Sequence, residues 1–85
     1  MGQERVLDVR GLEPPEPLER VLEAVATLQP GERVRMIHHR APCLLYPLLE
    51  KRGFRYIAEA KSEDLHEILI WRKEDAEAAP LGLTP

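Results

Sequence analysis

The chain has 85 residues, of which 44% are hydrophobic and 32% charged, and its net charge is −3. This length allows one small domain with one core. The negative charge argues against nucleic-acid binding, and no apolar run is long enough to span a membrane. The charged N-terminus is unlike a signal peptide, and the single cysteine fits a reducing compartment, so we expect a cytoplasmic protein. The bias towards Arg, Glu and Pro hints at a thermophilic source.

The first half of the chain predicts a strand, a helix and a second strand. Residues 5–10 alternate as in a short strand, which Gly11 and the prolines after it end. The helix has Pro17 in its first turn, where a missing N–H costs nothing, and Pro30 lies beyond its end. Its apolar face is formed by Leu18, Val21, Leu22, Val25 and Leu28. Residues 32–38 form the second strand.

The second half predicts another helix and a hairpin. Residues 43–53 read as a helix that Gly53 closes. Pro47 lies inside this run and should kink the helix or confine its regular hydrogen bonding to one part. Residues 54–60 and 65–73 are two strands with a short turn between them, which indicates a β-hairpin.

The order of elements predicts an α/β (α+β) two-layer sandwich, β-α-β-α-β-β. Right-handed crossovers make the first three strands parallel, and the last strand returns antiparallel. Both helices then cover one face of a four-stranded mixed sheet. We expect a single domain over residues 1–73, followed by a disordered tail over 74–85.

The sheet face away from the helices carries apolar residues that a solvated face would not need. The set comprises Val6, Ile37, Ile57 and either Ile68 with Ile70 or Leu69 with Trp71. These side chains are either scattered apolar surface or a patch for homodimerisation that includes Trp71.

The first corner, LDVRGLEPPEP at residues 7–17, resembles the TusA/SirA sulfur-carrier superfamily. The positions that match its motif are Leu7, Asp8, Gly11, Pro15 and Pro17. The resemblance covers about residues 6–73 and implies the same fold. The persulfide-carrying Cys of that family falls on Pro14, which has no thiol, so sulfur carriage by that mechanism does not transfer. The turn is most similar to an uncharacterised branch with G-L-x-P-P-E-P, often found beside hemerythrin-like domains.

The corner has two interpretations. A helix N-terminus favours anions, but Glu13, Glu16 and Glu19 crowd this one and the prolines remove donors. The turn is therefore either a rigid strand-to-helix corner or a ligand or partner site built on it. We expect Asp8 to accept hydrogen bonds from the turn backbone, and Arg10 to pair with Asp8 or Glu13.

The ends of the first two strands should bring a second group of polar residues to this corner. Parallel strands place Arg10 and Glu13 near the residues that follow the second strand. These are His38, His39, Arg40 and Cys43. Two adjacent residues of a strand point to opposite sides, so His38 and His39 should not share a metal. Weak metal candidates are His38, His39 and Cys43, but the four-ligand spacing of a structural zinc site is missing.

The remaining predictions for these side chains are structural. We expect two ordinary strand-end histidines, one of them partly buried and hydrogen-bonded, and a structural His66. Cys43 stands near a helix start, which favours a reactive thiol, but its neighbours Leu44 and Leu45 favour burial.

The sequence therefore predicts a non-enzymatic module that acts through protein contacts, with an unknown partner and no cofactor. It contains no nucleophile–base–orienter set and no Gly-rich phosphate loop. One alternative is a small redox- or metal-linked protein that uses Cys43 with His38 or His39. Another is a sulfur-transfer protein whose thiol has moved to Cys43. The candidate ligand or partner site comprises Asp8, Arg10, Glu13, Pro14, Pro15, Glu16, Pro17, His38, His39, Arg40 and Cys43.

Overall fold

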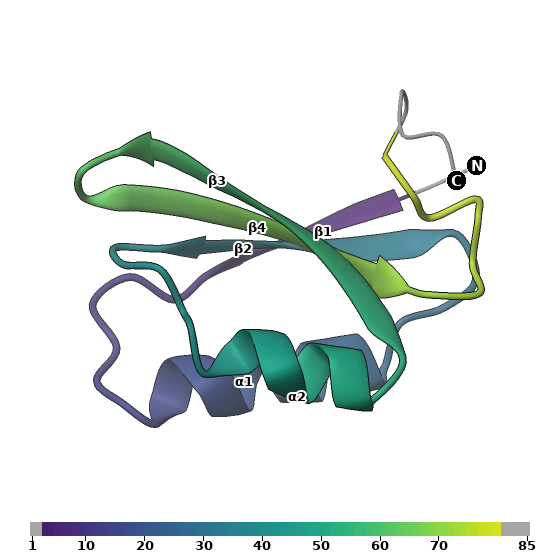
Figure 1. The fold of residues 1–85 in the computed structure, drawn as a ribbon, viewed down its shortest axis with the longest axis horizontal. Helices are drawn as coiled ribbons and strands as arrows, with labels where there is room; N and C mark the ends of the chain where they lie inside the picture. The colour runs from purple at the N-terminus through teal and green to yellow at the C-terminus, as the bar shows by residue number, and fades with distance from the viewer. Residues whose placement is uncertain (1–2, 81–85) are drawn as a thin grey trace.

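Six elements follow the predicted order over residues 3–80, the part of the chain that the computed structural model describes (Figure 1). They are β1 (Gln3–Asp8), α1 (Glu16–Ala26), β2 (Glu32–His38), α2 (Leu45–Lys51), β3 (Phe54–Ser62) and β4 (Leu65–Arg72). The predicted fold class, an α/β structure with two helices and a mixed four-stranded sheet, is confirmed.

The strands are arranged in the order β1-β2-β4-β3. β1 and β2 pair in parallel, whereas β4 pairs antiparallel with both β2 and β3. The first three strands thus run in one direction, as predicted, but the last strand inserts between the second and the third. The apolar run ILIW at residues 68–71 fits a strand that is covered on both faces, with Ile68 and Ile70 in the main core and Leu69 and Trp71 against Ala78.

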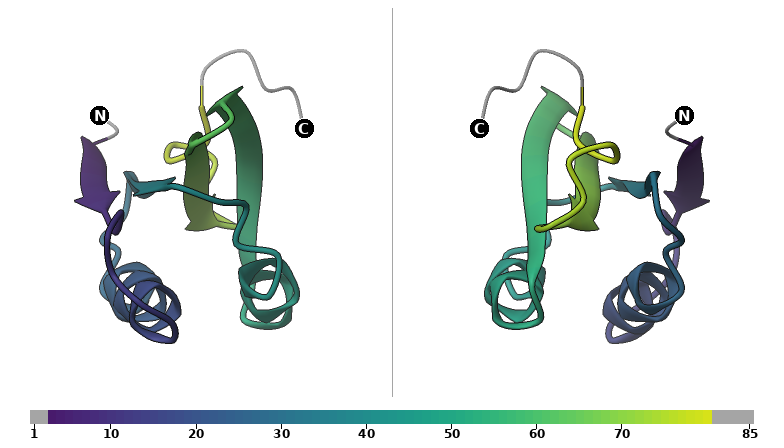
Figure 2. Two further views of the ribbon diagram at one scale, coloured as in Figure 1. Left: turned by 90° about the vertical axis from the view of Figure 1, so that its left-hand side faces the viewer. Right: turned by 90° about the vertical axis from the view of Figure 1, so that its right-hand side faces the viewer.

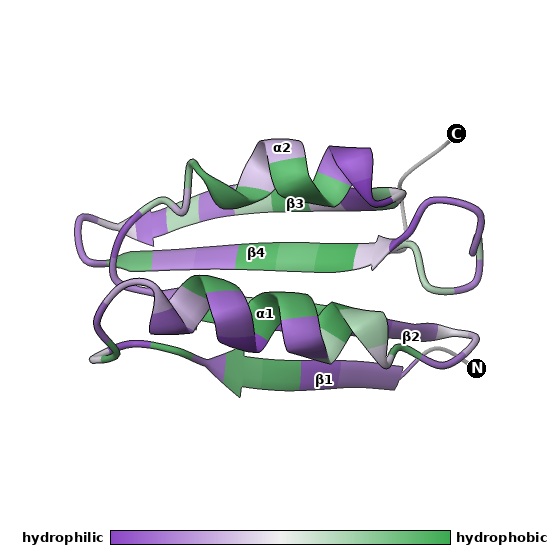
Figure 3. Cartoon of the chain, turned by 90° about the horizontal axis from the view of Figure 1, so that it is seen from below, coloured by the Kyte–Doolittle hydropathy of each residue, from purple (hydrophilic) through white to green (hydrophobic). Residues whose placement is uncertain are grey.

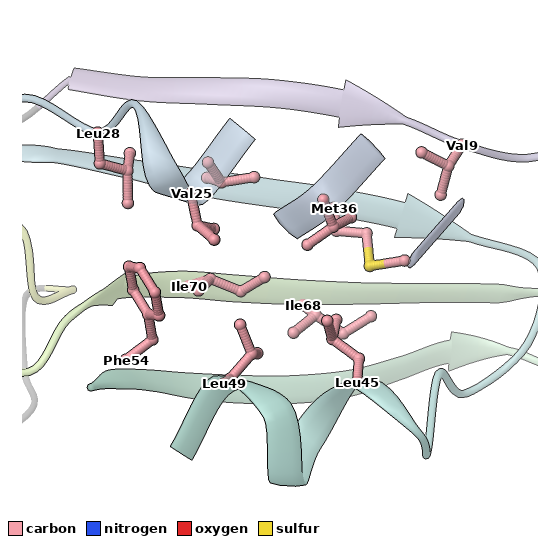
Figure 4. Close-up of a cluster of buried hydrophobic side chains, with 11 residues drawn as sticks. Val9, Val25, Leu28, Met36, Leu45, Leu49, Phe54, Ile68 and Ile70 are labelled. Carbon is pink, nitrogen blue, oxygen red and sulfur yellow. The ribbon is translucent and has the colours of Figure 1, made fainter. Parts of the chain in front are cut away.

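The two helices lie side by side on one side of the sheet, α1 along β2 and α2 along β3 (Figures 2 and 3). The main core fills the space between these layers (Figure 4). Its buried members are Val9, Val21, Val25, Leu28, Val34, Met36, Leu45, Leu49, Phe54, Ile68 and Ile70. Each fully buried aliphatic side chain of this size contributes about 2 kcal/mol to the stability of the fold.

The apolar stripe of α1 faces the sheet as the spacing predicts. Val21 and Val25 are fully buried, and Leu18 and Leu22 pack beside them. Glu19 and Glu23 are exposed on the opposite side. This amphipathic pattern orients the helix, and so decides which side chains of its first turn meet the sheet.

α2 is shorter than the run that predicts it. It begins at Leu45, so Pro47 falls in its first turn, where backbone N–H groups have no partner within a helix. Of the two expectations for Pro47, confinement of the regular helix to one part is correct. Leu45 and Leu49 are fully buried and anchor the helix to the sheet, and Gly53 ends it with a φ of 86°.

The open face of the sheet carries Leu69 and Trp71, since Ile68 and Ile70 belong to the main core. Residues 74–80 form turns against this face, where the sequence predicts a disordered tail; residues 81–85 lie outside the described part. Ala78 is fully buried on Leu69 and Trp71, which is only 5% exposed. The chain itself therefore covers the part of the open face on which the predicted homodimer patch depends.

Ion pairs divide the rest of the open face. Glu4 on β1 accepts hydrogen bonds from Arg33 Nε at 2.9 Å and Arg35 Nε at 2.6 Å, and Arg35 also binds Glu67 of β4 at 2.6 Å. Burial opposes ionisation of Glu4, but the hydrogen bond from Arg35 outweighs it and lowers the pKa of that carboxyl. Val6, which is 62% exposed, lies beside this network, so the apolar residues of this face do not form one continuous patch.

Within residues 3–80, neither helix has the length and apolar character that crossing a membrane requires.

Candidate functional site

The loops that follow β1 and β2 meet at one end of the molecule, on the left in Figure 1. Between them the structure contains a half-open cleft of about 330 Å³, which we call the corner cleft. Its lining consists of Pro14, Pro15, Pro17, Leu18, Met36, His38, Arg40, Ala41, Pro42, Cys43, Leu44 and Leu45. The cleft thus lies outside the carboxyl ends of the two parallel strands, where ligands bind in open α/β sheets.

A smaller hollow of about 190 Å³ adjoins the corner cleft. It is lined by Gly11, Leu12, Glu13, Pro14, His38, His39 and Arg40. Pro14, His38 and Arg40 border both spaces. Eight of the predicted site residues therefore lie around this cleft, namely Pro14, Pro15, Pro17, His38, Arg40 and Cys43 in its lining and Glu13 and His39 in the adjoining hollow.

Asp8 and Arg10 stabilise the turn and line neither space. Asp8 Oδ1 accepts the backbone N–H of Arg10 at 3.0 Å, and its carboxylate binds the guanidinium at 2.9 and 2.7 Å. These hydrogen bonds lower the pKa of Asp8 to about 2. Of the two partners predicted for Arg10, the structure selects Asp8. Gly11 follows with a φ of 85°, which a residue with a side chain rarely adopts.

The prolines form one wall of the corner cleft and begin α1. Pro15 precedes the helix and Pro17 is buried in its first turn, while Glu16 is exposed. Glu16 and Glu19 lie in this first turn, so acidic side chains of the chain itself already face the positive end of the helix dipole. Pro14 lies in the wall of the cleft and also borders the hollow.

His38 forms part of the floor. Its side chain is on the helix-facing side of β2 with Val34 and Met36, and it is only 6% exposed. Among the described residues, its Nδ1 is buried and has no hydrogen-bond partner. The expected partly buried, hydrogen-bonded histidine is therefore not His38 but His39, which is half-buried and accepts a hydrogen bond from Arg40 Nε. Burial lowers the pKa of His38, and the nearby His39, Arg40 and His66 lower it further.

His39 lies close to His38 and does not point away from it. The ring centroids are 4.6 Å apart in an edge-to-face arrangement. β2 ends at His38, so the alternation of a strand no longer holds at the next residue. Arg40 Nε donates to His39 Nε2 at 3.3 Å, and His66 of β4 pairs with His38 across the sheet. Three histidines and an arginine therefore gather beside the cleft.

Cys43 is an exposed free thiol at the rim of the corner cleft. The prediction that Leu44 and Leu45 favour its burial is wrong, because the regular helix starts only after Leu44. Leu45 turns into the core and is fully buried, whereas Leu44 is 80% exposed. The turn that precedes α2 thus presents the Cys43 thiol and the Leu44 side chain to solvent.

The weak metal candidates do not assemble into a binding set. Within residues 3–80, no three His, Cys, Asp or Glu side chains are grouped so that they could hold a metal ion.

Several lining residues were not predicted from the sequence. They are Leu18, Met36, Ala41, Pro42, Leu44 and Leu45. Ala41 and Pro42 follow β2 just as the first prolines follow β1. Adjacent parallel strands indicate that both loops border one crevice, so the whole second loop could have been included. The burial of Leu45 beside an exposed Leu44 carries no such signal.

The fold and the cleft define the chain as a small α/β protein with an apolar site at the carboxyl ends of two parallel strands. Residues 6–72 match a family of uncharacterised conserved proteins, DUF2249, and the chain belongs to this family. No match was found among curated proteins or among solved structures.

Proposed function

We propose that this protein is a non-enzymatic, TusA-like module whose corner cleft binds an apolar group of a partner protein. The observation that carries the proposal is the cleft itself. Four prolines and the side chains of Leu18 and Leu44 line it, and Leu44 extends into solvent without cover from the described residues. Exposed apolar side chains beside a concave apolar surface are typical of binding sites.

Rigid walls favour binding at this place. Proline rings have few conformations to lose when a partner docks, so less ordering entropy opposes association. The pairing of Asp8 with Arg10 further stabilises the turn that carries Pro14 and Pro15. With proline where the related motif has its cysteine, this corner offers a surface and no nucleophile.

Site-specific photo-crosslinking tests the proposal. Benzoylphenylalanine at Leu44 should give discrete adducts in cells of the source organism, whereas the same group at Val6, exposed on the opposite face, should give few. Ala41→Glu, which puts a charge at the rim of the cleft, should remove most of the adduct from position 44. Ala26→Glu, at the far end of α1, is the matched control.

Equal adducts from positions 44 and 6, or adducts that Ala41→Glu leaves unchanged, would contradict a binding role for the cleft. The homodimer predicted through the open face has less support, because Ala78 already occupies the surface of Trp71.

A second candidate function is sulfur transfer through Cys43, and the exposure of the Cys43 thiol at the cleft favours this function. In this reaction the Cys43 thiolate attacks the outer sulfur of a persulfide on a cysteine desulfurase. The donor's S–S bond breaks, a new S–S bond forms on Cys43, and the donor leaves as a thiol. Incubation with a persulfidated desulfurase should add the mass of one sulfur atom to the protein and none to Cys43→Ser. An unmodified Cys43 would exclude this candidate.

A further inference from the structure

One residue that lines the corner cleft carries a polar group that the protein leaves unsatisfied. His38 lines the cleft, and its buried Nδ1 has no hydrogen-bond partner among residues 3–80. Burying such a group without a partner destabilises the protein. No hydrogen bond to Nδ1 fixes the orientation of the ring. The ring can therefore make a half-turn about the Cβ–Cγ bond without losing a hydrogen bond, and this turn exchanges the positions of Nδ1 and Cδ2. A ligand that offers an oxygen to this ring would remove the cost.

The charges around His38 favour an anionic ligand. The side chains that act on it electrostatically are His39, Arg40 and His66, all of them cationic when charged. Arg40 borders both the cleft and the adjoining hollow, and its Nε donates to His39. Glu13 is the acidic residue in the hollow. Arg10 is already neutralised by Asp8, so Arg40 is the cation best placed to meet an anion at the cleft.

The size and shape of the cleft limit what this anion can belong to. A volume of about 330 Å³ holds roughly ten non-hydrogen atoms at the ~30 Å³ that one water molecule occupies in the liquid. That is one apolar residue together with its carboxylate. The proline walls have no N–H to donate, so the acid group should turn to His38 and Arg40 and the apolar group to the walls. The half-open mouth lets a preceding chain leave.

We propose that the corner cleft binds the C-terminus of a partner chain that ends in an apolar residue, with its carboxylate at His38 and Arg40 and its side chain against Leu18 and the prolines. This inference rests on the proposed function and names the part of the partner that docks. A carboxylate joined to an apolar side chain at a chain end satisfies the orphaned ring, the cationic surroundings and the apolar walls together.

The test uses the full chain and two peptides that differ only at the end. Acetyl-Gly-Gly-Leu with a free carboxylate should bind at least about tenfold more tightly than its C-terminal amide, because only the acid makes charge-assisted hydrogen bonds. Binding is measured by NMR titration of backbone amides, with shifts expected around Leu18, Ala41 and Leu45. The His38 ring resonances should report a rise in the pKa of His38 with the acid and none with the amide.

Two variants with a matched control examine the residues. Arg40→Gln should weaken binding of the acid by about fivefold or more and bring it close to the amide. Arg52→Gln, an exposed position after α2, should leave it unchanged. His38→Phe keeps a ring in the floor but offers no nitrogen, and it should remove the preference for the acid.

Three results would overturn the inference. Equal binding of the acid and the amide would leave the cleft a purely apolar site. Failure of both peptides to bind at a concentration of about 10⁻² M would remove the chain end as a ligand. Binding of a free short acid, 4-methylpentanoate, as tight as that of the peptide would assign the cleft to a small molecule. If crosslinking from Leu44 still depends on Ala41 in the first two cases, the proposed function stands and only the chain-end inference fails.

Discussion

At the scale of single residues, His38 combines features that stability alone would not favour. It is buried, its Nδ1 has no partner among residues 3–80, and Arg40 and two further histidines lie near it. Apolar residues such as Met36 fill the same face of β2. A side chain that reduces stability at a cleft is typical of a functional site, where binding and stability compete.

Replacing His38 with Phe tests this trade-off in the free protein. We expect His38→Phe to raise the free energy of unfolding by about 1 kcal/mol at pH 7.5, since it removes a buried unpartnered nitrogen and keeps a ring. Urea denaturation followed by circular dichroism measures it. His66→Phe, at a less buried position opposite His38 on β4, should raise the free energy of unfolding by less. A clear loss of stability in His38→Phe alone would mean that the imidazole stabilises the fold.

The lowered pKa of His38 predicts how stability depends on pH. The unfolded chain, with a histidine pKa near 6.5, binds a proton that folded His38 takes up only at lower pH. Stability is therefore fully present above pH 6.5 and falls as the pH drops towards the folded pKa of His38. The slope from this one group is at most about 1.4 kcal/mol per pH unit.

Urea denaturation at pH 7.5 and 5.5 measures this effect, and His38→Phe should reduce the difference. His39, Arg40 and His66 face His38 and contribute to the wild-type background. The carboxyls with lowered pKa values are Glu4, Asp8 and Glu59. They lose their contribution only as the pH falls below their ordinary values near 4, outside this range. An equal slope in the wild type and His38→Phe would assign the pH dependence to other groups.

At the scale of elements, α2 depends on its surroundings to form. A helix of 7 residues is too short to be stable alone, so the burial of Leu45 and Leu49 has to hold it. Local sequence determines the two ends of the helix. Pro47 is tolerated because it lies in the first turn, and Gly53 allows the chain to turn out of the helix into β3. The late start of the helix is what exposes Cys43 and Leu44.

We expect Gly53→Ala to destabilise the protein by about 1 kcal/mol. Gly53 has a φ of 86°, which costs a residue with a Cβ about 1–2 kcal/mol. The added Cβ would meet no atom of the described residues within 4 Å, so the cost comes from the backbone alone. Urea denaturation gives the value, with Lys51→Ala, an exposed position in α2, as the control. A Gly53→Ala protein as stable as the control would show that the turn can relax.

At the scale of the whole molecule, the sheet has a layer on each face. The helices cover one face, and residues 74–80 cover the Leu69 and Trp71 end of the other. Asp75 Oδ2 fixes this segment by accepting the N–H of Gly31 at 2.7 Å, and Arg33 reaches the carbonyl of Ala78 at 3.4 Å. The corner cleft lies at the opposite end from these contacts, so the two can be changed separately.

Ala78→Asp should detach this segment and expose Trp71. A carboxylate at a fully buried position against Leu69 is costly, so we expect a loss of about 1–2 kcal/mol in stability and a red shift of tryptophan emission. Trp71 is the only tryptophan, so the emission reports on this site alone. Ala76→Asp, at an exposed position in the same segment, should change neither. Emission that is unchanged in Ala78→Asp would mean that the segment does not cover Trp71.

The amino-acid sequence by itself determined the order of the elements, the directions of the strands and the buried face of α1. It also predicted that the first corner and His38 lie close together. These features follow from local periodicity and from turn residues such as Gly11, together with the handedness of β-α-β units.

Only the tertiary structure decided that β4 lies in the centre, that Trp71 faces Ala78, and that His38 is buried without a partner among residues 3–80. The same holds for the exposure of Cys43. An apolar pattern records which side of an element avoids water, but not which neighbour covers that side. Which neighbour covers it depends on packing between segments far apart in the chain, and the same packing determines which polar groups find hydrogen-bond partners.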